Sequence, residues 1–203
     1  MIYHIDFNKM IEIETHPLAP FLPANAKLLM MGSFPPPPER WKMQFYYPNF
    51  QNDMWRIFGL VFFDNKEHFL DLSHKKFHEE LIRNFLIEKG IAIFDTAYQI
   101  RRLKGNAADQ FLQVVTPTNL ENLLQQIPLC HALMTTGDKA TDTLMQQLPE
   151  GTIKPTIGQP STTFYADREL QLFRMPSSSR AYPLALEKKA QSYADFFQKI
   201  HLL

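Results

Sequence analysis

The sequence predicts an α/β fold, a three-layer α/β/α sandwich in which helices cover both faces of a mainly parallel central sheet. Apolar runs of strand length at residues 26–31, 91–94, 132–136 and 170–175 alternate with segments of helical periodicity. This alternation is typical of parallel sheets. The chain has 203 residues, of which 45% are hydrophobic, so we expect a single domain over residues 1–203.

The N-terminal half is expected to contain three helices. Residues 1–12 form a short leading helix. A second helix follows Asn52 or Asp53, either of which can cap its first turn. A third helix begins at Ser73 and ends at Gly90. Its apolar face consists of Phe77, Leu81, Phe85 and Leu86.

Three further helices are predicted over residues 119–126, 138–148 and 186–202. Residues 33–52, in contrast, are rich in proline and aromatic side chains and have no periodicity, which predicts a long loop. Loops of this length inside a compact domain tend to carry function.

The four predicted strands each end in a distinctive loop. These loops begin with Gly32, Asp95, Thr135 and Pro176. Because the carboxyl ends of parallel strands meet at one edge of the sheet, and ligands bind there, we expect the four loops to line one crevice.

Composition limits the classes of function. The 21 basic and 21 acidic side chains balance, which argues against dense coating of nucleic acid but leaves room for a local basic face. Cys130 is the single cysteine, so no intrachain disulfide or cysteine metal cluster can form, as suits a reducing cytoplasm. No run resembles a signal peptide or a membrane span, so we expect a cytoplasmic protein without a membrane partner.

The most informative stretch starts at the end of the first strand. Gly32 lets the backbone approach a ligand, and Pro35 fixes the loop that follows. Tyr46 and Tyr47 can offer a flat wall to a base, and the Asn52 amide can hold a water or read a base edge. The alternative interpretation is a proline-aromatic loop that only caps the core.

Gly-Ser-Phe-Pro at 32–35, the tyrosine pair at 46–47, and an asparagine three residues before Trp55 resemble a known signature. It is that of the uracil-DNA glycosylase superfamily, and most closely of its mismatch-specific uracil and hypoxanthine-DNA glycosylase-like branch. Met-Pro-Ser-Ser-Ser-Arg at 175–180 is similar to the segment that this superfamily inserts into DNA at the flipped nucleotide.

Two shorter segments add to the resemblance. Residues 90–95 are similar to the strand whose last residue reads the base, and residues 134–140 to the strand-to-helix element that follows. The four segments occur in the expected order over residues 28–180. Each is weak alone, and together they are fairly specific.

The resemblance implies a monofunctional DNA glycosylase that hydrolyses the N-glycosidic bond of a flipped base, without metal or organic cofactor. Its partner would be DNA containing a damaged or mispaired base, and we expect a monomer. Asn52 would position the water, and backbone N–H groups near Gly32 and Ser33 would stabilise the departing base. The base pocket would comprise Gly32, Phe34, Tyr46, Tyr47 and Asp95. The DNA contacts would comprise Pro176, Ser177, Ser178, Ser179, Arg180, Arg101 and Arg102.

Two departures from the family pattern keep alternatives open. Phe34 stands where mismatch-specific enzymes carry a catalytic asparagine, so that role would pass to Asn52. Asp95 stands where the family usually has asparagine, and an ionised carboxylate only accepts hydrogen bonds, which favours a base that presents N–H groups over uracil. The competing hypotheses are a catalytically inactive module that binds nucleic acid or nucleotides and, more weakly, a small-molecule hydrolase on the same scaffold.

Two other groups of side chains each allow a functional and a structural interpretation. Arg101, Arg102 and Lys104 form a basic cluster that suits either phosphate contacts or a solvated loop. His74 and His78 have the spacing of a metal pair, but no third ligand stands at motif spacing, so a surface pair is the better interpretation.

Overall fold

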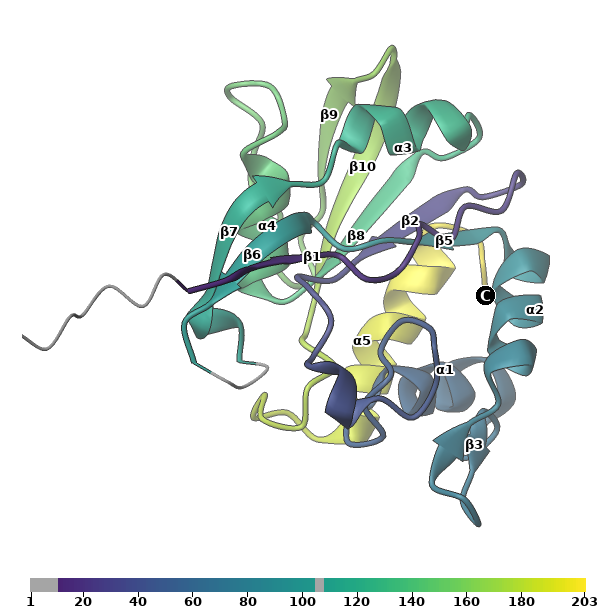
Figure 1. Ribbon diagram of the computed structural model, residues 1–203. Coiled ribbons are helices and arrows are strands. Elements are labelled where there is room, and N and C mark those ends of the chain that lie inside the picture. Colours follow the sequence, from purple (N-terminus) through teal and green to yellow (C-terminus); the bar gives the residue numbers. More distant parts are fainter. Residues whose placement is uncertain (1–10, 105–107) are drawn as a thin grey trace, which may run out of the picture.

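The computed structural model describes residues 11–104 and 108–203 and has a five-stranded sheet at its centre (Figure 1). The strands, in their order across the sheet, are β5 (Ile91–Ile93), β2 (Leu28–Met31), β8 (Ala132–Thr136), β10 (Arg168–Met175) and β9 (Ser161–Tyr165). The first four are parallel, and only β9 runs antiparallel, along the edge. The predicted α/β class and mainly parallel sheet are therefore confirmed.

Helices cover both faces of this sheet. In Figure 1, α1 (Met54–Phe63), α2 (Glu79–Lys89) and α5 (Leu186–Lys199) lie on one side of it. Helices α3 (Leu120–Gln126) and α4 (Asp138–Met145) lie on the other. Parallel strands covered on both faces must be apolar on both faces, which explains why β2, β5 and β8 are short, fully buried runs.

Most predicted helices occur with shifted ends. Asn119 caps α3 through its side chain, which accepts the N–H of Asn122 at 2.9 Å. Helix α4 ends three residues earlier than expected, at Met145, and α5 ends at Lys199. No helix within the described ranges combines the length and the hydropathy that a bilayer-spanning segment needs.

The prediction that Ser73 starts a helix is wrong. A small hairpin, β3 (Leu70–Asp71) and β4 (Lys76–Phe77), occupies this segment, and Ser73 lies in its turn with its hydroxyl donating to Asp71 at 2.7 Å. Helix α2 begins only at Glu79, and the face that it buries differs from the predicted one. Leu81, expected in the core, is 41% exposed, and Ile82 is buried instead.

Residues 1–10 of the predicted leading helix lie outside the described residues. Residues 11 and 12 are not helical and lead into strand β1 (Ile13–Thr15).

A second, antiparallel sheet was not predicted. It consists of β1, β6 (Ala97–Arg102) and β7 (Leu112–Pro117), with β6 in the middle. Its small core contains Ala97, Ile100 and Leu112, and Phe34 packs against it. Two 3₁₀ turns, Pro38–Arg40 and Asp109–Phe111, lie in the loops near this sheet. Because β6 starts two residues after Asp95, the small sheet stands beside the carboxyl edge of the large one.

Candidate functional site

The carboxyl ends of β2, β5, β8 and β10 open into one crevice of about 690 Å³. The ends of the first three strands contribute Gly32, Asp95 and Thr136. The loop after β10 contributes residues 177–183, and the long loop after β2 closes the opposite wall. The predicted convergence of four strand ends is therefore confirmed. The sequence-predicted residues that line the crevice are Gly32, Ser33, Phe34, Tyr46, Tyr47, Asn52, Asp95, Ser177, Ser178, Ser179 and Arg180.

Asn52 combines two positions that the sequence left as alternatives. Its side-chain oxygen accepts the backbone N–H of Met54 at 2.9 Å, so it stabilises the start of α1. The same residue lines the crevice. An amide oxygen has two lone pairs and the amide nitrogen two donors, so the turn leaves most of the group's hydrogen-bonding capacity available.

The tyrosine pair divides between core and crevice. Tyr46 is 2% exposed, and its hydroxyl donates to the carbonyl of Ala19 at 2.8 Å, so its ring belongs mainly to the core. Tyr47 is half-buried, and its hydroxyl lies 3.3 Å from that of Thr136. Burial raises the pKa of Tyr47, which keeps it a neutral phenol. Tyr47 therefore forms the aromatic wall that the sequence assigned to both residues.

Tyr47 also has an unusual backbone conformation. Its φ of 52° lies in the left-handed region, which few residues other than glycine adopt. Such conformations persist only where the surrounding structure holds them, and they cluster at binding sites. The conformation fits a residue whose side chain must point into the crevice.

Asp95 has a partner that sequence reasoning missed. The Nε2 atom of His16 lies 2.9 Å from Asp95 Oδ2, and the two side chains are 0% and 8% exposed. The Nδ1 atom of His16 faces the carbonyl and the N–H of Leu18, at 3.0 and 3.2 Å. The pair joins residues 79 positions apart. No motif marks His16, so the sequence held no signal for it.

Asp109 is a second carboxylate of the crevice that was not predicted. It accepts a hydrogen bond of 2.6 Å from the hydroxyl of Ser33, and its other oxygen faces Gly137. Burial raises the pKa of Asp109, the Ser33 hydrogen bond opposes that shift, and the negative charge of Asp95 adds to it.

The raised pKa of Asp109 predicts how its replacement changes stability with pH. The folded protein holds this proton more tightly than the unfolded chain, so ionising Asp109 costs stability as the pH rises through its folded pKa. We therefore expect Asp109→Asn to raise the free energy of unfolding at pH 7. At pH 3, below the ordinary pKa of 3.8, the gain should vanish. Urea unfolding of both proteins at the two pH values measures this, and a loss of stability at pH 7 would contradict it.

The Ser177–Arg180 loop folds on its own hydroxyl groups. The Ser177 hydroxyl accepts the N–H of Ser179, and the Ser179 hydroxyl accepts the N–H of Ala181, both at 3.2 Å. Because these hydroxyl oxygens act as acceptors, their protons remain to donate to a ligand in the crevice. Pro176, also expected here, lines a smaller neighbouring cavity, and its carbonyl accepts the hydroxyl of Tyr193.

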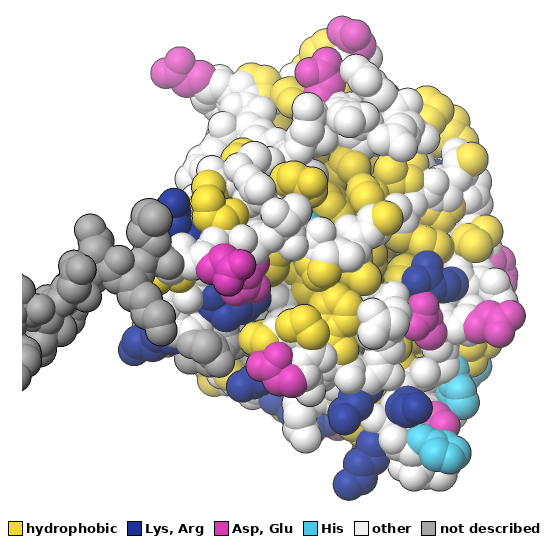
Figure 2. Space-filling model, in the orientation of Figure 1, with side chains coloured by type: hydrophobic (Ala, Val, Ile, Leu, Met, Phe, Trp, Pro, Cys, Tyr) yellow, Lys and Arg dark blue, Asp and Glu magenta, His cyan; other side chains and the backbone are white. Residues whose placement is uncertain are grey.

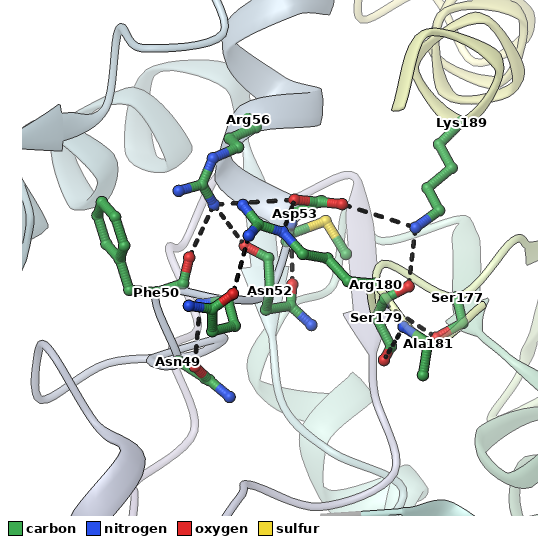
Figure 3. A network of polar contacts seen from close by, with 12 residues as sticks. Asn49, Phe50, Asn52, Asp53, Arg56, Ser177, Ser179, Arg180, Ala181 and Lys189 are labelled. Carbon is green, nitrogen blue, oxygen red and sulfur yellow. Dashed lines mark hydrogen bonds and ion pairs between the residues drawn. The ribbon is translucent and has the colours of Figure 1, made fainter. Parts of the chain in front are cut away.

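A buried ionic network joins this loop to the start of α1 (Figure 3). Asp53 lies 3.0 Å from Arg180, 3.7 Å from Lys189 and 3.8 Å from Arg56. The backbone N–H of Asp53 also donates to Ser178 at 3.0 Å, and Lys189 donates to Ser179 at 2.8 Å. We call Asp53, Arg56, Arg180 and Lys189 the Asp53 network. It carries one negative and three positive charges.

The Asp53 network was not visible in the sequence, where Asp53 served only as a possible helix cap. Its side chain makes no capping bond to α1. Lys189 is 1% exposed, and burial lowers its pKa, which the charge of Asp53 opposes. A lysine so deeply buried needs a paired carboxylate. The Asp53 network therefore fixes the position of the Ser177–Arg180 loop relative to Asn52.

The predicted basic cluster lies apart from the crevice. The Arg102 guanidinium forms a bidentate pair with Glu14 at 2.9 Å and donates to the Pro35 carbonyl at 3.1 Å. Arg102 thus supports the small sheet and the Gly32–Pro35 loop from behind. Arg101, in the same strand, is partly exposed and does not line the crevice.

The histidines at 74 and 78 do not face a common ligand. His74 pairs with Asp71 at 2.7 Å in the exposed hairpin turn, while His78 precedes α2. Within residues 11–104 and 108–203, no group of three or more histidine, cysteine or acidic side chains could hold a metal ion.

Charge is mixed on the face shown in Figure 2. Acidic and basic side chains both occur there around a hydrophobic area, with acidic ones at the top of the view and mostly basic ones along the bottom. Attraction of a polyanion would therefore depend on local groups, such as Arg40 and Arg180 at the crevice.

The fold is similar to that of a solved structure. It is the solution NMR structure of a protein from Methanosarcina acetivorans that is provisionally described as a uracil DNA glycosylase. The two chains are 20% identical, the match covers 94% of this chain and 99% of that one, and the TM-score is 0.58. At this identity the likeness shows a shared fold. No protein-family model matches the chain, and no curated protein matches it.

Proposed function

We propose that this chain is a DNA glycosylase that hydrolyses the N-glycosidic bond of a flipped deaminated or damaged base, of the uracil, hypoxanthine or xanthine class, in base-excision repair. One observation carries the proposal. Asn52 and the Ser177–Arg180 loop, far apart in the sequence, are joined by Asp53 at the mouth of a crevice whose floor holds Asp95. The shared fold with the archaeal structure supports the same class of function.

The arrangement suits a flipped nucleotide. The hydroxyl groups of the Ser177–Arg180 loop would donate to DNA phosphates, and Arg180 would lie beside the duplex. The base would enter the crevice between Tyr47 and Phe34. Extruding it costs a few kcal/mol, and the cost is lowest for a damaged or mispaired base, which supplies part of the selectivity.

Water is the nucleophile in this proposal. Asn52, at the crevice edge, would orient a water toward C1′ of the sugar through the lone pair that Met54 leaves unused. None of the described residues that line the crevice is a lysine, and Lys189 is bound to Ser179 and Asp53. This supports a monofunctional enzyme, which hydrolyses the N-glycosidic bond without forming a covalent intermediate with a lysine amine. We further propose that it acts as a monomer in the cytoplasm.

The second candidate is an inactive nucleic-acid or nucleotide-binding module on the same fold. The hydrogen bond that Asn52 accepts from the Met54 N–H favours it, because an asparagine that only stabilises a helix start needs no catalytic role. Phe34 also favours the inactive module, because its apolar ring stands where the mismatch-specific enzymes that the sequence resembles carry a catalytic asparagine.

A base-release assay separates the two. Oligonucleotides carrying uracil, hypoxanthine, xanthine or no lesion, single-stranded and paired, are incubated with the wild-type protein and with Asn52→Ala. We expect release of at least one lesion base, and a loss of at least tenfold in the variant, because the water is no longer oriented. The turn bond lost with Asn52 should lower the free energy of unfolding by about 1 kcal/mol.

Asn119→Ala is the matched control. It removes an equivalent side-chain bond at the start of α3, and Asn119 does not line the crevice, so the variant should cost similar stability while release is unchanged. Binding of lesion DNA without release of any base would support the inactive module instead.

A further inference from the structure

The floor of the crevice carries negative charge. Asp95 reaches it from the end of β5, and Asp109 from the loop before β7. The cations that line the crevice among the described residues, Arg40 and Arg180, come from the long loop and from the Ser177–Arg180 loop, and Arg180 is already paired with Asp53. Lys139 also acts on Asp109, from the neighbouring cavity.

The hydrogen bonds around His16 determine which form of Asp95 faces the ligand. If Nδ1 accepts the N–H of Leu18, Nε2 must carry a proton and donates it to Asp95; if the ring is protonated, both nitrogens donate. In the remaining arrangement, Nδ1 donates to the Leu18 carbonyl, and Nε2 accepts a proton carried by Asp95. That arrangement would place the proton on the carboxylate although the imidazole is intrinsically the stronger base. Asp95 is therefore an ionised acceptor whose Oδ2 is already engaged.

The second oxygen of Asp95 is directed at the crevice. Asp95 Oδ1 lies 2.7 Å from the position that a Cβ atom on Gly32 would take, beside the Tyr47 hydroxyl at 3.3 Å from the same point. Among the described residues it accepts no hydrogen bond, and it is not one of the side-chain atoms sealed from solvent, so it is open to the crevice that Asp95 lines. A carboxylate oxygen that faces a crevice without a protein donor can accept a hydrogen bond from a ligand or lie beside a positive charge on it.

We propose that the base subsite takes a purine that carries positive charge on its ring, through alkylation or protonation of a ring nitrogen, in preference to uracil. This inference rests on the proposed glycosylase function and specifies its substrate class. Tyr47 and Phe34 supply aromatic faces that attract a cation, while Asp95 accepts from a ring or exocyclic N–H.

The charge of the leaving base explains the preference. When the bond from N9 of N7-methylguanine to C1′ breaks, its electron pair neutralises the cationic ring, the attacking water forms the new C1′–O bond, and one proton goes to solvent. Uracil leaves with the same electron pair as an anion. An anion forming a few Å from ionised Asp95 is disfavoured roughly 100-fold or more in a protein site of intermediate dielectric.

The test compares rate enhancements over spontaneous loss for N7-methylguanine, hypoxanthine and uracil in the same duplex, using the full chain. We expect the rate enhancement for N7-methylguanine to exceed that for uracil by at least 100-fold. The value for hypoxanthine, which must first be protonated, should lie between them. Asp95→Asn keeps an acceptor for His16 and removes the charge, so it should narrow this ratio at least tenfold.

A measurement on the wild-type protein guards against a variant that fails to fold. N7-methylguanosine, whose ring keeps its positive charge because the bond from N9 to the sugar is intact, should inhibit base release more strongly than uridine. Faster release of uracil than of N7-methylguanine, or stronger inhibition by uridine than by N7-methylguanosine, would overturn the inference and leave the glycosylase function intact. Absence of release from all three lesions would overturn the proposed function itself.

Discussion

Replacing Asp53 with alanine should lower the free energy of unfolding by about 3 kcal/mol, the largest effect on stability that we expect from a polar residue of the site. The variant leaves Arg56, Arg180 and Lys189 without their shared carboxylate. Removing one partner of a buried ion pair costs about 3–5 kcal/mol. We take the lower end because Arg180 is 47% exposed and keeps part of its hydration.

The control is Lys189→Met, which removes a charge but keeps a long side chain packed in the same place. Asp53 then still contacts Arg180 and Arg56, so the cost should be about 1 kcal/mol. The double variant should lose less free energy of unfolding than the two single variants lose together, because with methionine at position 189 there is no buried lysine that needs the Asp53 carboxylate. Urea unfolding measures all three proteins. A cost below about 0.5 kcal/mol for Asp53→Ala would show that the Asp53 network does not stabilise the fold.

Gly32→Ala should reduce base release roughly 100-fold. The added Cβ atom would lie 2.7 Å from Asp95 Oδ1 and 3.3 Å from the Tyr47 hydroxyl. Asp95 can move aside only by breaking its bond to His16, and both side chains shape the base subsite. Displacements of about 1 Å in an active site can cost a factor of about 100 in rate.

Gly151→Ala separates this effect from general destabilisation. Gly151 has a φ of 85°, so alanine is strained there, but nothing lies within 4 Å of the added atom and the residue is remote from the crevice lining. We expect it to lose about 1 kcal/mol of stability and to release base at the wild-type rate. If the Gly32→Ala variant keeps full activity, the close approach of Gly32 to Asp95 does not matter for function.

The sequence predicted the central sheet because its parallel strands are buried on both faces and stand out as apolar runs. It did not predict β9, an edge strand that begins with three polar residues and whose side chains alternate between half-buried and exposed, with Phe164 67% exposed. The β1–β6–β7 sheet was missed for a related reason. Its strands mix polar or charged residues with apolar ones, and its core is only a few side chains.

The residues of the candidate site could likewise be predicted only in part. Residues at strand ends, such as Gly32 and Asp95, could be predicted because topology alone brings strand ends together. Their partners could not. His16 reaches Asp95 across 79 residues, and Asp53 meets Arg180 across 127. A sequence shows that charges exist, but only the packing of loops and helices decides which of them are neighbours.

The span of the Asp53 network also bears on the order of folding. Its contacts join the start of α1 to α5, the last helix of the chain. Contacts between such distant segments form late, because the entropy of closing the intervening loop must be lost first. During synthesis, α1 leaves the ribosome well before Lys189 does, so a partly made chain holds Asp53 without its cations. The crevice then takes its final shape only after the central sheet is in place, and nascent chains should not yet bind its ligand.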